Sequence, residues 1–319
     1  MRLKLMTRNP EPLKETLSLI SHVRKFIILK FTNDELTIIL VNGQTISLEP
    51  QVWCKLKMSS LFESIIIESK QGDAVLIELN VDLLLQTLRN FDKANSEGLN
   101  LKLQRTETSG KPGVNTKVGR TASLALYYSN LNINANVINH TFKIPAKIVK
   151  DPINVLHEPQ RPHLGFFFKM PHEFVTMFKR LEKFKKTPSG DLVTIKASKL
   201  NKAYLGFILE EEGKYKVTIS WNGTIEVAEK IVSDSQSSED AVHELQSQTD
   251  EDHYHLDNTV EQAAFKVKLK DWQLASKIVG RCKEVVLDIG PNDCSLHCDL
   301  DGTGDVEIAY FVNGYRSSV

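Results

Sequence analysis

The sequence has few of the features that mark membrane proteins, secreted disulfide-rich proteins or common enzymes. No apolar run reaches the roughly 20 residues that a membrane-spanning helix needs. Only four cysteines occur in 319 residues, at positions 54, 282, 294 and 298, which is too few and too scattered for a secreted disulfide framework. The first five residues, MRLKL, are typical of a strand rather than a signal peptide. We therefore expect an intracellular protein.

Common enzyme signatures are also missing, including a glycine-rich phosphate loop, a nucleophile elbow, a zinc-binding HExxH helix and a dinucleotide fingerprint. The most enzyme-like string is residues 294–305, where Cys294, His297 and Cys298 could supply three zinc ligands if the segment were a loop. Alternation predicts a strand instead, with both cysteines facing a core and His297 facing the other way. We expect no metal, cofactor or catalytic residue. A metal-dependent enzyme using residues 294–305 is an alternative that bound-metal analysis would test.

Lysine and arginine together number 40, as do aspartate and glutamate, yet the basic residues are unevenly placed. Segments 11–25, 80–93, 171–186 and 270–283 each carry apolar residues at helical spacing on one side and basic residues on the other. One basic helix face usually serves solubility or the helix dipole, but four together favour nucleic-acid binding. The predicted contact residues are Lys14, Lys25, Arg89, Lys93, Lys179, Arg180, Lys183, Lys186, Lys270, Lys277 and Arg281.

Much of the balancing acid lies between residues 233 and 265, where nine Asp or Glu residues occur without Lys or Arg. Residues 233–259 contain too few large apolar side chains to offset the cost of ordering the chain, which predicts a mobile acidic loop. Ser235 and Ser247 are each followed by glutamine, the preference of DNA-damage kinases, and are candidate phosphorylation sites.

Strand-like runs dominate the rest of the chain, and both halves follow the order strand, helix, several strands, helix, several strands. A proline-rich joint at 151–162 separates the halves. The architecture is therefore repeated within the chain. This repeat predicts antiparallel sheets that bury one face under four helices. The expected strands are 26–31, 36–41, 52–57, 61–67, 74–79, 99–104, 123–128 and 139–149, then 164–169, 192–198, 203–210, 214–221, 224–232, 264–270, 284–290, 295–300 and 306–312.

Several short strings, in their order along the chain, resemble one family, the fungal Hus-type subunit of the heterotrimeric DNA-damage checkpoint clamp, a relative of PCNA. The strings are MRLKL at residue 1, LTII at 36, VWC at 52, INHTFKIPAK at 138, LHEP at 156, ISWNG at 219, and KDW at 270 through EVVL at 284. The resemblance implies an α+β, PCNA-like DNA-clamp fold of two similar domains, each with antiparallel sheets and two helices. The domains would be 1–150 and 164–319, joined by a connecting loop at 151–163.

The same resemblance implies a non-enzymatic ring subunit that encircles DNA, with the helices lining the hole, and serves as a sliding platform for damage signalling and repair. The implied partners are two other checkpoint-clamp subunits, an ATP-driven clamp loader and double-stranded DNA with single-stranded junctions, in the nucleus and without a membrane. A homomeric processivity clamp for a polymerase is the alternative. The size-exclusion mass of the pure chain separates the two, because a self-sufficient clamp trimerises alone.

Exposed sheet edges carry unpaired hydrogen-bonding groups, and a ring supplies the strands that pair with them. We expect one subunit contact from the strand around 140–147 and the other from the strand around 204–210. The predicted interface residues are His140, Phe142, Ile144, Lys147, Tyr204, Phe207 and Leu209.

Overall fold

The computed structural model describes residues 1–41, 49–69, 74–91, 96–105, 122–131, 137–149, 157–160, 166–183, 192–199, 203–211, 215–221, 224–229, 262–290 and 293–315. The acidic segment 233–259, with Ser235 and Ser247, lies outside these residues. So do Lys93, Lys186 and all of the predicted connecting loop 151–163 except 157–160. What the sequence predicts for them stays a prediction.

The described part of the first domain contains nine strands and three helices. The strands are β1 (Arg2–Thr7), β2 (Phe26–Phe31), β3 (Glu35–Leu40), β4 (Gln51–Lys57), β5 (Ser64–Glu68), β6 (Val75–Asn80), β7 (Leu99–Arg105), β8 (Ala122–Leu131) and β9 (Val137–Ile148). The helices are α1 (Glu11–Ile20), α2 (Met58–Leu61) and α3 (Val81–Arg89).

The described part of the second domain repeats this order. Its strands are β10 (Phe166–Lys169), β11 (Leu192–Ser198), β12 (Tyr204–Glu211), β13 (Tyr215–Ser220), β14 (Glu226–Glu229), β15 (Gln262–Lys268), β16 (Glu284–Ile289), β17 (Asp293–Asp299) and β18 (Val306–Asn313). Its helices are the short 3₁₀ helix η1 (His172–Phe174), α4 (Val175–Glu182), α5 (Leu269–Leu274) and α6 (Ser276–Val279).

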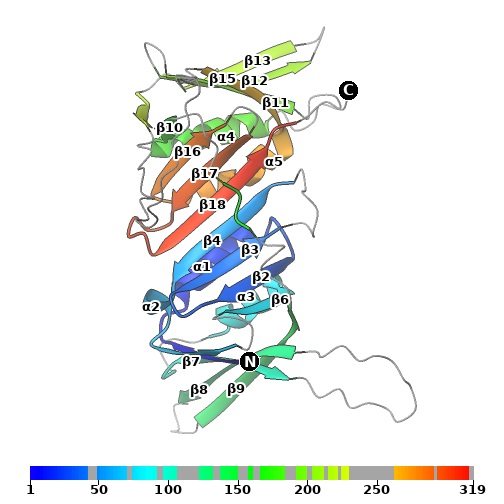
Figure 1. Ribbon diagram of the computed structural model, residues 1–319, viewed down its shortest axis with the longest axis vertical. Helices are drawn as coiled ribbons and strands as arrows, with labels where there is room; N and C mark the ends of the chain where they lie inside the picture. The colour runs from blue at the N-terminus through cyan, green and yellow to red at the C-terminus, as the bar shows by residue number, and fades with distance from the viewer. Residues whose placement is uncertain are drawn as a thin grey trace, which may run out of the picture.

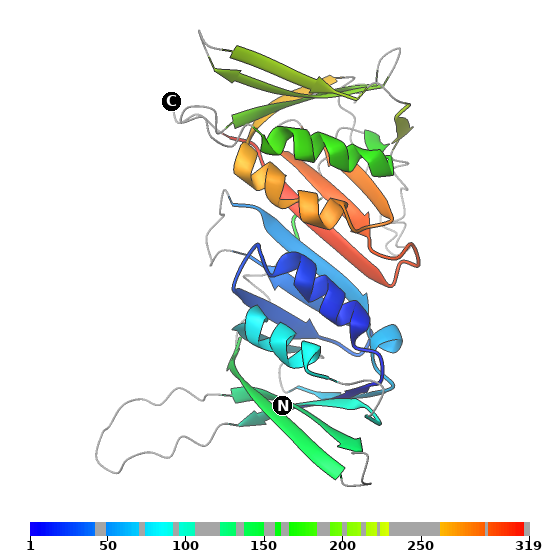
Figure 2. The same ribbon diagram turned by 180° about the vertical axis from the view of Figure 1, so that it is seen from behind.

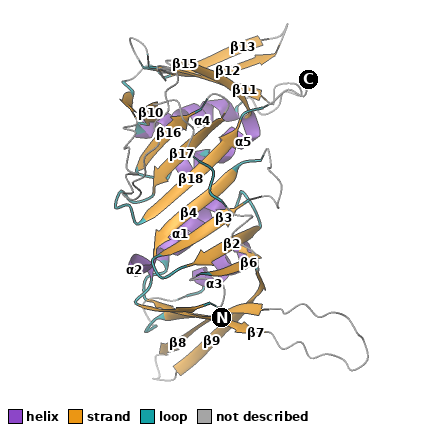
Figure 3. Ribbon diagram, viewed as in Figure 1, coloured by secondary structure: helices purple, strands orange, loops and turns teal. Residues whose placement is uncertain are grey.

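Antiparallel sheets form one layer of an elongated molecule, with the first domain at one end and the second at the other (Figure 1). The larger sheet runs through both domains in the order β14-β10-β16-β17-β18-β4-β3-β2-β6-β9-β8-β7-β1-β5. A smaller sheet, β13-β12-β11-β15, completes the second domain. Helices α4, α5, α1 and α3 lie along one face, as the reverse view shows (Figure 2), so that in Figure 3 they sit behind the strands. None of the described helices is long and apolar enough to cross a membrane.

Each main helix forms because its apolar stripe has a sheet to cover. The side chains of Leu17 on α1, Leu84 on α3, Phe178 on α4 and Trp272 on α5 are at most 1% exposed, as the helical spacing predicts. The start of α3 is fixed by Asn80, whose Oδ1 accepts hydrogen bonds from the backbone N–H groups of the second and third helical residues at 2.9 and 3.3 Å.

One local prediction is wrong. The strand expected at 61–67 begins only at Ser64, because residues 58–61 form the single helical turn α2. Phe62 closes this turn by donating its backbone N–H to the carbonyl of Met58 at 2.9 Å. A four-residue helix is too short to show a hydrophobic period, so the sequence pattern missed it.

The two domains join through direct strand pairing. Strand β18 runs antiparallel to β4, from Val306 opposite Leu56 to Phe311 opposite Gln51. On the helix side, α1 packs against α6, and the Nε2 atom of His22 lies 3.2 Å from the carbonyl oxygen of Leu274. The larger sheet and its hydrophobic core therefore continue across the junction.

Three thiols lie in the buried core at this junction. Cys54 belongs to the first domain, whereas Cys282 and Cys298 belong to the second, and all three are at most 3% exposed. A hydrogen bond with Cys282, together with burial, raises the pKa of Cys298 well above its usual range, and burial does the same for Cys54. Cys54 and Cys298 therefore stay protonated. All three buried cysteines act as small apolar side chains that pack the two domains together.

Candidate nucleic-acid interface and open sheet edges

The predicted basic residues that the structure describes lie on the helix layer, opposite the buried stripes. Lys179 and Arg180 on α4, Lys183 at its C-cap, Lys270 on α5 and Lys277 on α6 are exposed. So are Arg281, which follows α6, Arg89 on α3 and Lys25, which follows α1. The helices that carry or precede these lysines and arginines come from both domains and lie on one face of the molecule (Figure 2).

Lys14 differs from the others. Its ammonium group lies 2.5 Å from the carboxylate of Glu11, one helical turn earlier on α1. Glu15 on the same helix and Asp82 on α3 are exposed as well, so the first-domain helices offer a mixed surface. The prediction from helical spacing identified the basic positions. It took no account of acidic residues on the same helix, which reduce the positive charge of that surface.

Among the described residues, strand β9 has an open edge along most of its length. It pairs with β8 on one side, and on the other side the described pairing is that of residues 146–148 with β6. Val149 donates its backbone N–H to the carbonyl of Leu76 at 3.1 Å, and this bond sets the alternation of the strand. Even-numbered residues of β9 therefore point their N–H groups at β8, and the odd-numbered Asn139, Thr141 and Lys143 point theirs at the open side.

Pro145 stands at the point where the β6 pairing of β9 ends. As an odd-numbered residue it falls where a backbone N–H would point away from β8, so proline removes no bond of that ladder. The predicted contact strand at 140–147 thus contains an open edge at its beginning. Of the predicted interface residues there, Ile144 is only 3% exposed and belongs to the core, while His140 and Phe142 are half-buried.

The second predicted edge is wrong. Strand β12, which contains Tyr204, Phe207 and Leu209, is an interior strand that pairs with β11 on one side and β13 on the other. Phe207 and Leu209 are fully buried, because an interior strand over a helix layer carries its apolar residues into the core. The edge of this sheet is β13, with no further strand beside it in the described residues.

The edge of β13 has the same alternation as β9. Trp221 donates its backbone N–H to the carbonyl of Leu205 at 3.0 Å, just beyond the register pair Gly206–Ser220. Because directly opposite residues in antiparallel pairs alternate between bonded and non-bonded, Ile219 and Val217 bond to β12. Lys216 and Thr218 therefore turn their N–H and C=O groups outward.

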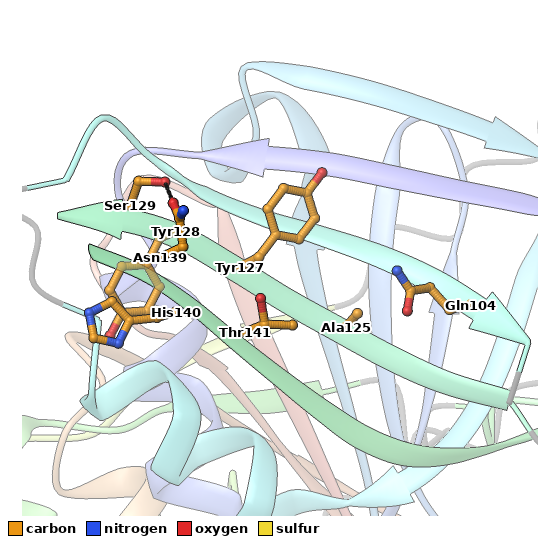
Figure 4. Close-up of a pocket in the computed structure, with 8 residues that line it drawn as sticks. All are labelled: Gln104, Ala125, Tyr127, Tyr128, Ser129, Asn139, His140 and Thr141. Atoms are coloured by element: carbon orange, nitrogen blue, oxygen red, sulfur yellow. Dashed lines mark hydrogen bonds between the residues drawn. The ribbon is translucent and has the colours of Figure 1, made fainter. Parts of the chain in front are cut away.

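A polar hollow adjoins the β9 edge on the sheet face that points away from the helices. Figure 4 shows the side chains that line it from three neighbouring strands, among them Gln104, Tyr127 and Thr141. The hydroxyl of Ser129 lies 2.7 Å from Oδ1 of Asn139 across β8 and β9. On the opposite face, His140 stacks on Tyr128 with ring centroids 4.6 Å apart.

The string at 294–305 is a strand and a turn, as the alternation predicts. Cys294 and Cys298 lie in the core, and His297 points to the other face, where its ring packs edge-on against Phe311 at 5.8 Å. The turn that follows is held by Asp299, whose carboxylate accepts the backbone N–H groups of Gly302 and Gly304 at 3.0 and 2.8 Å. No group of potential metal ligands comes together in the described residues.

Comparison with known proteins defines the class of this molecule. The proliferating cellular nuclear antigen of Entamoeba histolytica superposes with a TM-score of 0.61 over 98% of this chain and 99% of that chain, at 8% sequence identity. The fold is that of the PCNA-like sliding clamps, as the sequence predicts. The chain matches the family of Hus1-like proteins over residues 1–316, and it belongs to this family.

A curated relative agrees with this assignment. The chain is 23% identical to the DNA damage checkpoint control protein MEC3 of Eremothecium gossypii, in an alignment of 350 residues that covers 92% of this chain and 90% of that protein. The family resemblance carried by the short strings is thereby confirmed.

Proposed function

We propose that this protein is a non-enzymatic subunit of a heterotrimeric ring that encircles DNA and acts as a sliding platform for DNA-damage checkpoint signalling and repair. Its membership of the Hus1-like family and its likeness to a checkpoint control protein support this role. The observation that carries the proposal is a regularity in the strand pairing, which leaves the chain with two complementary open edges.

The pairing scheme of the first nine strands recurs in the second nine, when each strand number is increased by nine. Pairs β1–β5, β1–β7, β2–β3, β2–β6, β3–β4, β7–β8 and β8–β9 recur as β10–β14, β10–β16, β11–β12, β11–β15, β12–β13, β16–β17 and β17–β18. The short β6–β9 pairing recurs as one bond, from the N–H of Tyr315, just past β18, to the carbonyl of Lys266 on β15 at 2.6 Å.

The junction pair β4–β18 has no counterpart within the part of the chain that the structure describes. Shifted by nine strands, β4 becomes β13 and β18 becomes β9. In the described residues, β13 is a terminal strand and β9 is open along most of its length, and both have backbone groups that point outward. They lie in different domains and in different sheets. The β13 edge of one subunit would therefore pair with the β9-type edge of the next, in a head-to-tail contact. Such contacts close into a ring when the rotation permits.

The helix layer would line the hole of this ring. Exposed lysines and arginines there would neutralise DNA phosphates without reading base edges, which gives binding that does not depend on sequence and permits sliding. The predicted contact residues Lys14, Lys25, Arg89, Lys179, Arg180, Lys183, Lys270, Lys277 and Arg281 all come from this layer or its connections. Lys93 and Lys186 complete the predicted set.

The proposed partners are two different clamp subunits, an ATP-driven clamp loader and duplex DNA with single-stranded junctions, in the nucleus. Affinity purification of the tagged chain under native conditions, followed by mass measurement, tests the ring. We expect one copy of this chain with one copy of each of two related subunits. A complex of three copies of this chain alone would favour the homomeric clamp, and a stable monomer without stoichiometric partners would count against any ring.

Encirclement has its own test. The purified assembly, loaded onto nicked circular DNA by its loader, should stay bound at high salt and leave when the circle is cut once, because a ring slides off a free end. Retention that does not change on cutting would mean that the complex grips DNA without enclosing it.

A further inference from the structure

We infer that duplex DNA contacts this subunit chiefly through its second domain, on a ridge formed by α4 and the α5–α6 pair. This inference rests on the proposed function and refines it. The ridge consists of six basic residues, Lys179, Arg180, Lys183, Lys270, Lys277 and Arg281. The ligand chemistry is the sugar-phosphate backbone of duplex DNA. The helices of the first domain, which the repeat places in equivalent positions, do not carry the same charge.

The ridge residues are exposed and free to meet an anion. None of the six takes part in an ion pair within the described residues. Residues 175–183 contain three basic side chains and one acidic one, Glu182, and residues 269–281 contain three basic side chains and Asp271. Asp271 is only half-exposed, and burial raises its pKa against the opposing effect of Lys268 and Lys270. Each helix unit of the ridge thus has an excess of two positive charges.

The first-domain helices lack this excess. On α1, Lys14 is paired with Glu11 and Glu15 remains exposed. On α3, Asp82 offsets Arg89, and the exposed positions between them are the apolar Leu83, at 44% exposure, and the uncharged Gln86. A phosphate brought to this surface would meet carboxylates at close range, and like charges repel there. Lys25 is the one exposed first-domain residue of the predicted set that stands apart from an acidic partner on its own helix.

The helices are arranged so that the charge changes along the molecule. Helix α4 packs against α5 and α6, α6 packs against α1, and α1 packs against α3, which is also their order along the long axis in Figure 2. Positive charge is therefore concentrated at one end of the helix layer, and DNA in the ring would lie closer to the second domain of this subunit than to the first.

Two matched triple variants of the assembled ring test this. One replaces Lys179, Lys183 and Lys277 by alanine, and the other replaces Lys14, Lys25 and Arg89. Binding of a short duplex oligonucleotide is measured by fluorescence anisotropy at several salt concentrations, after native mass has shown that each ring is assembled. Removing one lysine or arginine that neutralises a phosphate lowers the slope of log K against log salt by about 0.9. We expect the slope to fall by about 2 to 3 for the second-domain triple and by less than about 1 for the first-domain triple.

Equal slopes for the two triples, or a larger change for the first-domain triple, would overturn the inference while leaving the proposed function intact. A wild-type ring that shows no salt-dependent binding to duplex DNA would overturn the proposed function and this inference with it. If either triple fails to assemble, the single variants Lys277→Ala and Lys25→Ala provide the same comparison, and a larger effect of Lys25→Ala contradicts the inference.

Discussion

Replacing Thr218 by proline should weaken subunit association without unfolding the protein. Thr218 lies in the middle of β13, and its side chain is exposed. The alternation fixed by the Trp221–Leu205 bond directs the N–H of Thr218 to the open side of the strand. Proline there removes a donor that a neighbouring strand would use, and takes none from the bonds between β12 and β13.

The size of the effect follows from the junction inside the chain. The internal counterpart of this contact, β4 with β18, pairs six residues of each strand, and β13 also has six. Removing one donor leaves a buried carbonyl of the partner strand unsatisfied, at a cost of about 1–3 kcal/mol. That corresponds to roughly 5- to 150-fold weaker association. The clash of the proline ring with the incoming strand adds to it.

Val217→Pro is the matched control, because the N–H of Val217 points at β12 and takes part in the ladder. That variant should lose folding stability, whereas Thr218→Pro should unfold at nearly the same urea concentration as the wild type. Association is measured by titrating the variant with the purified partner subunits and measuring the mass of the complexes that form. Ring formation by Thr218→Pro at wild-type affinity would refute the assignment of β13 as a subunit edge.

Three further predictions concern stability. Asn80→Ala should destabilise the protein by about 1 kcal/mol through loss of the α3 cap, while Asn80→Asp keeps the acceptor oxygen and should cost less, as urea unfolding would measure. Burial lowers the pKa of His22 below 6.5, so the folded state binds its proton less readily than the unfolded chain; stability should fall as the pH drops through about 6.5, and His22→Gln should weaken that dependence. Trp272→Ala removes a fully buried side chain that stacks on Phe178 with ring centroids 5.0 Å apart, and should cost about 3–5 kcal/mol by circular dichroism in urea; a loss below about 1 kcal/mol would contradict this account of the core.

Most of the fold could be predicted from the sequence, because the patterns that mark helices and strands are local. Stripes such as Leu13, Leu17 and Ile20 repeat with the helical period, and the structure buries all three. The alternation of Cys294, Leu296 and Cys298 likewise assigned 294–305 to a strand rather than a metal loop, and these side chains are in the core. Such patterns require no knowledge of which elements meet in space.

Which strands become sheet edges depends on how distant segments pair, and no single segment contains this information. A strand at the edge of a sheet and a strand inside it can have the same composition. The sequence of β12, with its glycine and aromatic residues, therefore did not mark it as an interior strand, nor that of β13 as an edge. Pro145 is the one local signal of an edge, because proline is confined to positions where the ladder needs no donor, and it lies in the strand that is open. Nothing comparable marks β13.

The internal repeat provides the information on strand pairing that local patterns lack. One strand pair observed at the domain junction predicts an equivalent pair between subunits. If two domains share a pairing scheme, a strand pair formed once at their junction implies a second pair of the same kind that the chain alone cannot make. The backbone groups of Asn139, Thr141 and Lys143 on β9 and of Lys216 and Thr218 on β13 satisfy this requirement. Backbone edges alone do not choose between a copy of the same chain and a different one. That choice rests with the side chains beside the edges, such as Val137 and Ile138, which are 59% and 46% exposed at the start of β9. Exposed apolar residues beside an open edge cost little in a monomer and gain burial only against a partner of matching shape. The open strands therefore provide the contact, and the residues around them select the partner.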